Sequence, residues 1–300
     1  MMGYFELTKR DMKLFFKDKG YFISSLITPI ILLVLYATFL AKVYKDSFIS
    51  SLPTGFSIDE ALIDATVGGQ LASSLLAVSC ITVAFCANLL MISDKTTGAI
   101  GDITVTPVKR STVALSYFSA AAVSTLIVSF TALGACLLYL AKVGWYMSFL
   151  DVVSVGVDVL LLTLFGTALS SCVNFFLKTT GQASAVGTIV SAGYGFICGA
   201  YMPISNFSEG LQKVLGFLPG TYGTSLLKSH ALRGVFDEME NVGFPAEVIE
   251  GIRKSIDCDF SFFDRAVTDG AKLAVLSGSV AAFILLYVAL NMIFKRQKTK

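Results

Sequence analysis

Six long apolar runs constrain this chain more than any other feature, because each is long enough to cross a bilayer as a helix. The mean hydropathy is +0.74 and only 15% of the residues are charged, whereas soluble domains carry roughly a quarter. The runs are continuous rather than alternating, which favours helices over membrane strands. We therefore predict an all-α membrane protein, one domain over residues 1–300, with six transmembrane helices at 21–43, 66–92, 112–142, 152–177, 183–203 and 270–294.

The positions of Lys and Arg in the short flanks predict the orientation of these spans, because cytoplasmic loops carry an excess of basic residues. Three basic residues flank the spans on one side, Lys42, Lys45 and Lys142, against thirteen on the other. Both termini and the loop 93–111 are therefore predicted to be cytoplasmic, and residues 233–269 extracellular. The thirteen are Lys9, Arg10, Lys13, Lys17, Lys19, Lys95, Lys109, Arg110, Lys178, Lys295, Arg296, Lys298 and Lys300.

Residues 1–20 predict an interfacial helix that lies at the lipid headgroups. At about 100° per residue, Phe15 and Phe16 fall on an apolar arc, beside an arc that holds Lys9, Arg10 and Lys13. Such a helix turns its cations toward anionic lipid. An ordinary basic flank is the alternative, and the aromatic arc favours the interfacial helix.

Two further segments follow the fifth apolar run. Residues 204–232 are moderately apolar and are broken by Pro219-Gly220, which predicts an outer re-entrant hairpin of helix, break and helix. A surface amphipathic loop is the alternative. Residues 233–269 are acidic and polar, with a short helix expected at 245–257 after a proline in its first turn.

The sequence has no pattern typical of an enzyme. The phosphate-cradling motif GxxxxGK[ST] is absent, and so are the CxxC and HExxH patterns that bind metals. His230 is the single histidine and is interpreted as a packed or solvated loop residue. We therefore expect no catalytic residues, no metal and no cofactor in this chain, and no nucleic acid among its partners.

Asp158 is the one clear acid inside a predicted span. A carboxylate there is costly and should face a bundle interior, a wet cavity or a partner. It is either a residue of the translocation path or a structural partner of a cation in the outer hairpin, such as Lys213 or Lys228. Asn88 is a second polar candidate for the path, although hydrogen bonding between helices is the usual role of such a residue.

Small residues recur four apart in the fifth span, at Gly187, Ser191, Gly195 and Gly199. This spacing places them on one helix face, where another helix can approach closely. The pattern fits both an internal packing seam and a subunit interface.

The polar loop at 93–111 joins two spans and is too short to be a domain. Asp94, Thr96 or Thr97 is suited to cap a short helix, and Pro107 is suited to end it. Gly98 and Gly101 weaken this helix, and a plain turn is the alternative. The predicted apolar face is made by Ala99, Ile100 and Ile103.

Three stretches together resemble the membrane permease of bacterial type-2 ABC exporters, of the daunorubicin-exporter-like class. The first is KRDMKLFFKDKGYFISSLITPIILLVLY, a basic helix that runs into a span with an early proline. The second is SDKTTGAIGDITVTPVKRS, which looks like the family's acid–basic–x–x–Gly followed by Thr-Pro and a basic pair, although the family commonly has Glu at the position of Asp94. The third is GAYMPISNFSEGLQKVLGFLPGTYGTSLLKSHALRG, which is similar to the hairpin after the fifth span.

The resemblance implies roles for these segments. Two permeases, identical or related, would work with two ATP-binding cassette subunits in a bacterial plasma membrane, and the partner ATPases would bind ATP and Mg²⁺. The loop at 93–111 would be the coupling helix, seated on the ATPase through Asp94, Lys95, Thr97, Gly98, Ile100, Ile103 and Pro107. Pro203, Pro219 and Tyr222 would belong to an outer gate.

The predicted function is therefore the transmembrane subunit of an exporter that moves hydrophobic or amphipathic substrates, such as drugs, peptides or lipids. Two other classes stay open: an ion-coupled secondary transporter that uses Asp158, and a membrane assembly or sensor subunit that transports nothing.

Overall fold

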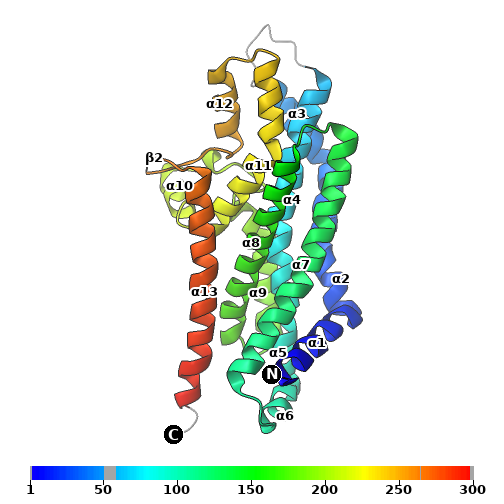
Figure 1. The fold of residues 1–300 in the computed structure, drawn as a ribbon, viewed down its shortest axis with the longest axis vertical. Helices are drawn as coiled ribbons and strands as arrows, with labels where there is room; N and C mark the ends of the chain where they lie inside the picture. Colours follow the sequence, from blue (N-terminus) through cyan, green and yellow to red (C-terminus); the bar gives the residue numbers. More distant parts are fainter. Residues whose placement is uncertain (1, 51–58, 264, 298–300) are drawn as a thin grey trace.

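The computed structural model describes residues 2–50, 59–263 and 265–297, which form an elongated bundle of helices (Figure 1). Lys298 and Lys300, counted in the orientation prediction, lie outside the described residues. The helices of the first half are α1 (Met2–Lys17), α2 (Lys19–Leu35), the π-helix η1 (Tyr36–Leu40), α3 (Ala41–Ser50), α4 (Glu60–Ala87), α5 (Leu89–Thr97), α6 (Ala99–Val105) and α7 (Arg110–Val143). Those of the second half are α8 (Phe149–Phe176), α9 (Thr180–Ile197), the 3₁₀ turn η2 (Ile204–Asn206), α10 (Glu209–Leu215), α11 (Pro219–Asn241), α12 (Ala246–Ser255) and α13 (Asp269–Gln297).

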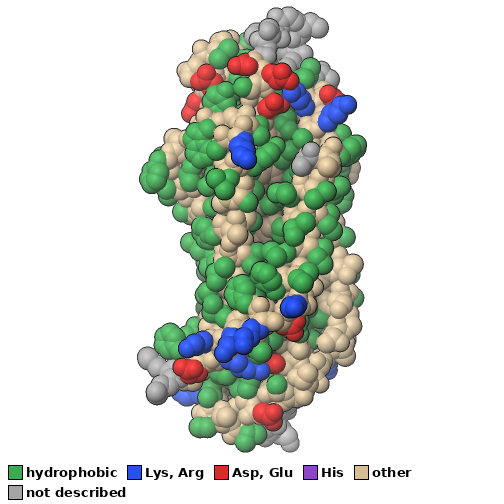
Figure 2. Space-filling model, turned by 90° about the vertical axis from the view of Figure 1, so that its right-hand side faces the viewer, with side chains coloured by type: hydrophobic (Ala, Val, Ile, Leu, Met, Phe, Trp, Pro, Cys, Tyr) green, Lys and Arg blue, Asp and Glu red, His purple; other side chains and the backbone are tan. Residues whose placement is uncertain are grey.

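The all-α membrane fold is confirmed, because among the described residues five helical stretches are long and apolar enough to cross a bilayer. On the face in Figure 2, hydrophobic side chains cover the middle of the molecule and charged side chains gather near its two ends. The sixth predicted span, 183–203, coincides with the 18-residue α9, which is not among the five, so the six-span count stays a prediction. The five stretches are Lys19–Asp46, Glu60–Thr97, Arg110–Val143, Phe149–Phe176 and Asp269–Ile293.

Helix α4 lies at the centre of the bundle and packs against α2, α7, α8, α9 and α11. Its small residues make this possible: a Cβ atom added to Gly69 would lie 2.5 Å from Leu232 of α11. Several of its buried hydroxyl groups donate to carbonyls one turn earlier, as Thr66 does to Leu62 at 2.7 Å and Thr82 to Val78 at 3.0 Å. These polar side chains are therefore satisfied inside a helix surrounded by protein.

Residues 204–232 form a helix, a break and a helix, and the second helix extends beyond 232. A re-entrant position of this hairpin stays a prediction. α11 begins at Pro219 and continues to Asn241, with Leu226, Leu227 and Leu232 fully buried. It packs against α4, α8 and α13. The short helix expected at 245–257 forms as α12, and a two-stranded hairpin that was not predicted follows it, β1 (Ser261–Phe262) with β2 (Arg265–Ala266).

Candidate functional site

The segment predicted to couple to a partner lies at the end of the molecule where α1, α5, α6 and both termini gather (Figure 1). The chain leaves α5 at Thr97, turns at Gly98 and enters the seven-residue α6. Gly98 has φ +84°, a left-handed conformation that glycine adopts without steric cost. It ends α5 and also precedes α6.

The predicted capping of this helix is wrong. Asp94, Thr96 and Thr97 all lie inside α5, and Gly98 occupies the position before α6. The hydroxyl groups of Thr96 and Thr97 each donate to the carbonyl of Ser93 at 2.9 Å, within their own helix. The cap was mispredicted because α5 extends one turn further than the apolar run suggests.

Asp94 is buried and joins three helices. Its two carboxylate oxygens accept from both terminal nitrogens of Arg10 in α1, at 2.6 and 3.3 Å. One of them also accepts from the Tyr117 hydroxyl of α7 at 2.5 Å. Fork-shaped guanidinium and carboxylate pairs of this kind are among the strongest polar contacts in proteins. Arg10 and Asp94 thus connect α1, α5 and α7.

Asp11 is a second acid beside Arg10, whose Nη1 donates to its Oδ1 at 2.8 Å. The other carboxylate oxygen of Asp11 is buried without a hydrogen-bond partner among the described residues. Burial raises the pKa of Asp11 to about 6, and the contact with Arg10 opposes this rise. Asp11 therefore holds its proton to a higher pH than an exposed aspartate does.

Lys95 connects α5 to the end of α8. Its Nζ donates to the carbonyl oxygens of Asn174, Phe175 and Leu177 at 3.0, 3.1 and 3.3 Å. The last carbonyls of a helix have no partner within the helix and carry partial negative charge, so an ammonium group there caps α8. Lys95 thus connects α5 to the C-terminal end of α8.

The apolar face predicted on α6 turns inward. Ile100 and Ile103 are partly buried and pack on a cluster made by Leu90, Met91, Val113 and Tyr117. The exposed side of α6 holds Asp102 and Val105 instead, and the Val105 side chain is 88% exposed. Pro107 is exposed in the turn before α7. The sequence analysis did not identify Val105 as an exposed residue of this helix. The signal for it was an apolar residue directly before Thr-Pro at the end of a polar loop.

Helix α1 forms where the interfacial helix is predicted, but its buried and exposed faces hold other residues than the predicted apolar and basic arcs. Lys9, Lys13 and Phe16 are exposed, whereas Phe15 is buried and Arg10 turns toward Asp94. The Tyr4 hydroxyl forms a 2.6 Å hydrogen bond with that of Ser119 in α7. α1 is therefore packed along α7 as well as amphipathic.

Each of the two polar candidates for a translocation path forms a contact with a neighbouring helix. Asp158 is fully buried, and its Oδ2 lies 2.6 Å from Nδ1 of His230 in α11. The cation partners suggested from sequence, Lys213 and Lys228, are not its partners, and the interpretation of His230 as a loop residue was wrong. Asn88 donates to the hydroxyl groups of Ser170 and Ser171, which joins α4 to α8.

The outer residues hold the hairpin in shape. Pro203 precedes η2, Pro219 starts α11, and the buried Tyr222 donates through its hydroxyl to the Gly216 carbonyl at 2.7 Å. The Tyr222 ring also packs on Phe260, with centroids 5.0 Å apart. Tyr222 therefore fixes the break between α10 and α11.

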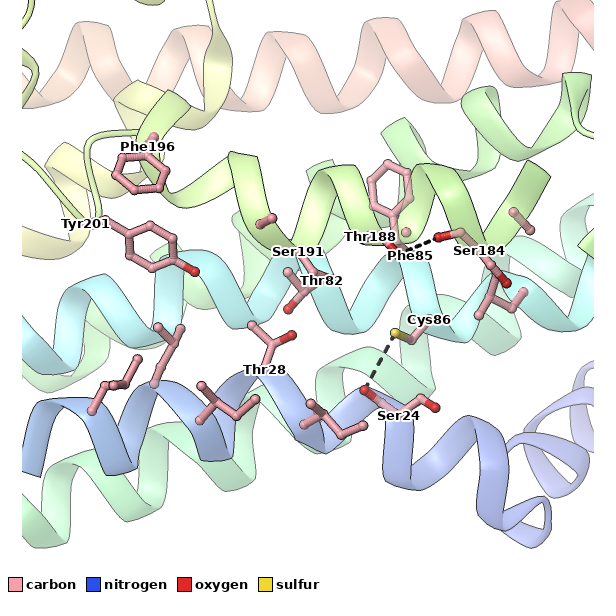
Figure 3. A pocket seen from close by; sticks show the side chains of 18 of the residues that line it. Ser24, Thr28, Thr82, Phe85, Cys86, Ser184, Thr188, Ser191, Phe196 and Tyr201 are labelled. Atoms are coloured by element: carbon pink, nitrogen blue, oxygen red, sulfur yellow. Dashed lines mark hydrogen bonds between the residues drawn. The ribbon is translucent and has the colours of Figure 1, made fainter. Parts of the chain in front are cut away.

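A large groove lies between α2 and α9, over α4 (Figure 3). Its volume is about 670 Å³. Aliphatic side chains come from α2 and aromatic ones from Phe85, Phe196 and Tyr201. Hydroxyl groups lie between them, from Ser24, Thr28, Thr82, Ser184, Thr188, Ser191 and Tyr201. This mixture suits a ligand that is mainly apolar and carries a few polar groups.

The stripe of small residues in α9 does not form one seam. Gly187 and Ser191 line the groove, whereas Gly195 lies against Tyr201, whose ring is 2.3 Å from the place of an added Cβ. Gly199 follows the helix with φ +75°. The small residues at one end of the stripe therefore line the groove, and those at the other end allow a tight turn after α9.

Comparison with known proteins agrees with this arrangement. No curated protein matches the chain. The family model for the ABC-2 type transporter matches residues 3–230, which includes α1, the α5–α6 segment and the first part of α11. Members of this family are non-catalytic transmembrane subunits that work with ATP-binding cassette subunits. The chain therefore belongs to the ABC-2 type transporter family and is a multi-pass transmembrane subunit of an ABC exporter.

Proposed function

We propose that α6 is the surface on which a separate ATP-binding cassette subunit docks, and that its movement drives export of hydrophobic or amphipathic substrates. The observation that carries this proposal is how α6 is connected to the rest of the bundle. It is a short exposed helix that follows directly on α5, and α5 is fixed to α1, α7 and α8 through Asp94 and Lys95. A force on α6 reaches four helices through these contacts.

The groove between α2 and α9 supports the proposed substrate class. Apolar walls lower the cost of removing a lipid-like molecule from the bilayer, and scattered hydroxyl groups pair with a few polar atoms. The side chains of α2 and α9 beside the groove include several exposed apolar residues, Ile27, Ile31 and Ile189 among them. A second permease copy or a related permease would cover them, so that the substrate passes between two chains.

The orientation belongs to the same proposal. Helices α1 and α6 and the end of α13 lie at one end (Figure 1), which also holds the exposed Lys9, Lys13 and Lys109. This supports a cytoplasmic position for this end in a bacterial plasma membrane. ATP and Mg²⁺ would then be bound by the partner ATPase. The daunorubicin-exporter-like class remains part of the proposal.

The test is Val105→Glu in vesicles that contain the chain and its cognate ATPase. A carboxylate on the exposed face of α6 has to be buried in the contact, so we expect stimulated ATP hydrolysis and transport to fall about tenfold or more. Stability should not change, because Val105 makes little contact within the chain. Vesicle uptake of a fluorescent amphipathic probe and phosphate release measure the two activities.

The matched control is Val242→Glu, an exposed valine after α11 at the opposite end of the molecule. It should leave both activities unchanged. Equal activity of Val105→Glu and the wild type would contradict docking on α6. ATP hydrolysis without any transport in the wild-type vesicles would favour the assembly or sensor function instead.

A further inference from the structure

A second groove crosses the bundle on another side and has no place in the proposed transport path. It lies between α2 and α7, with α4 beneath it, as two connected hollows of about 350 and 150 Å³. Leu33, Leu75 and Cys136 line both hollows. The groove exists because α2 and α7 each pack on α4, and because α7 presents small side chains to it, Ala132 and Ala135.

The chemistry of this groove fits hydrocarbon. In the larger hollow the one hydroxyl group belongs to Thr131, which donates to Ile127 of its own helix at 2.7 Å. The other hydroxyl groups are those of Tyr36 and Tyr139, in the smaller hollow. The walls therefore offer an occupant apolar contact and almost no free hydrogen-bonding group.

The length of the groove fits one leaflet. From Phe22 to Tyr36, both of which line it, the helix rises about 21 Å at about 1.5 Å per residue. Half of the hydrocarbon core of a bilayer is about 15 Å thick. An acyl chain that enters at the α1 end therefore remains inside the groove for its whole length.

The α1 end of the groove is basic and aromatic. Phe16 lies at this end, and its ring packs on that of Phe22 with centroids 5.7 Å apart. Lys13, Lys17 and Lys19 are exposed nearby along α1 and the start of α2, and none of them forms an ion pair within the described part of the chain. On the face in Figure 2, Lys and Arg side chains gather at this lower end, below the hydrophobic middle.

Asp18 is the acidic residue that lies among these lysines, and its carboxylate caps α2 instead of pairing with one of them. Asp18 accepts from the backbone N–H groups of Gly20 and Tyr21 at 2.8 and 3.3 Å, and so caps α2. The three ammonium groups are therefore available to an anion at the membrane surface.

We propose that the groove between α2 and α7 binds one phospholipid of the leaflet that adjoins α1, with an acyl chain between the helices and an anionic headgroup on Lys13, Lys17 and Lys19. This lipid fills the space that α2 leaves beside α7 and keeps the two helices at a fixed separation. The site is distinct from the groove between α2 and α9, since it lies on the other side of α2.

The experiment measures lipid retained by the purified full-length chain after extensive washing in mild detergent, by native mass spectrometry. We expect about one phosphatidylglycerol per wild-type chain when equal amounts of phosphatidylglycerol and phosphatidylcholine are supplied. Ala135→Trp fills the groove and should lose most of the bound lipid. Leu138→Trp, on an exposed part of α7 outside the groove, is the matched control and should retain it.

Headgroup recognition is tested separately. Lys13→Gln and Lys17→Gln should each lower the preference for phosphatidylglycerol about fivefold, whereas Lys142→Gln at the other end of α7 should not. Thr131→Phe fills the same groove one turn away and replaces Ala135→Trp if that variant does not fold, as judged by gel filtration. Equal retention by the groove-filling variants and Leu138→Trp, or no headgroup preference in the wild type, overturns the proposal.

Discussion

The two ends of the bundle both bury charged side chains, but they use them differently. At the α5–α6 end, Arg10 pairs with Asp94 across 84 positions of sequence, and the bonded groups all lie on long helices or at their ends. At the outer end, Lys228 and Lys272 are buried and donate to backbone carbonyls of two turns, those of Gly199 and Cys258, each at 2.7 Å. One end joins helices to each other. The outer end also has such a contact, between Arg233 of α11 and Asp151 of α8 at 3.2 Å, but there the buried lysines hold turns against helices.

In the proposed function, this difference gives the two ends different roles. The α5–α6 end transmits movement between helices, and the outer end holds its turns in place. In the proposed function, a displacement of α6 reaches α1, α7 and α8 through the contacts of Asp94 with Arg10 and Tyr117 and of Lys95 with the end of α8. The buried lysines of the outer end stabilise the turns that contain Gly199 and Cys258. Asp257 shows this second use: its Oδ2 accepts from the backbone N–H of Ile204 at 2.7 Å and lies 3.9 Å from the Lys228 Nζ.

The largest expected effect follows from Asp94→Ala. It leaves the Tyr117 hydroxyl without its partner and the Arg10 guanidinium with Asp11 alone, so the free energy of unfolding should fall by about 3 kcal/mol. Stimulation of the partner ATPase should be lost as well. Thermal unfolding in detergent and phosphate release measure the two effects.

Asp102→Ala removes an exposed acid from α6 and is the matched control for stability. It should unfold like the wild type. If Asp94→Ala retained full stability and coupling, the three-helix connection would not transmit force, and the contrast between the two ends would be lost.

Lys228→Met tests the outer end. The Gly199 carbonyl loses its donor and Asp257 loses its cation, so we expect a loss of about 2 kcal/mol in the free energy of unfolding. ATPase stimulation should survive at temperatures where the variant is folded. The exposed Lys254→Met is the control and should unfold like the wild type. Loss of coupling in the folded Lys228→Met variant would show that the outer turns also transmit motion.

Asp158→Asn separates the exporter from an ion-coupled transporter. The amide can still form a hydrogen bond with His230, so the variant should lose about 1 kcal/mol of stability and keep ATP-driven transport. Transport is measured in vesicles with the ATPase, with and without a proton gradient. Abolished transport in a stable variant would favour proton coupling through Asp158.

A further effect is the pH dependence from Asp11. Its pKa in the folded chain is about 6, above the ordinary value near 4, so the folded state holds the proton more tightly. The stability this adds is present below about pH 4 and is lost as the pH rises through about 6. Asp11→Asn should remove this fall, measured as unfolding midpoints across that range. Asp102→Asn should keep it, and identical slopes in Asp11→Asn and the wild type would refute the assignment.

Several elements were predictable because they depend on local sequence. The outer hairpin follows from Pro219-Gly220, since a proline starts a helix easily and breaks one that precedes it. The short α6 follows from the polar interruption after Ile92, and the three stretches that resemble an exporter permease lie in the family match. The exposed face of α6 was not predictable, because it depends on how Ile100 and Ile103 meet Tyr117 of another helix.

The same limit applies to the polar contacts. The sequence offered Lys213 and Lys228 as partners of Asp158, but the structure pairs it with His230. It also placed Arg10 among cations that face lipid, whereas Arg10 meets Asp94. The partner of each side chain depends on how one helix is rotated against another. This rotation leaves no periodic pattern in the sequence of either helix alone.

The sequence by itself determined that this chain lies in a membrane, where its apolar helices are, and which family it resembles. Only the tertiary structure decided what surrounds each helix. The spans that contain α4 and α13 have the same mean hydropathy, yet 89% of the first window is buried and 17% of the second. Hydropathy measures transfer from water into an apolar medium, and lipid and protein interior are equally apolar to it. Packing partners, and with them the coupling contacts and both grooves, are therefore set by how the helices assemble.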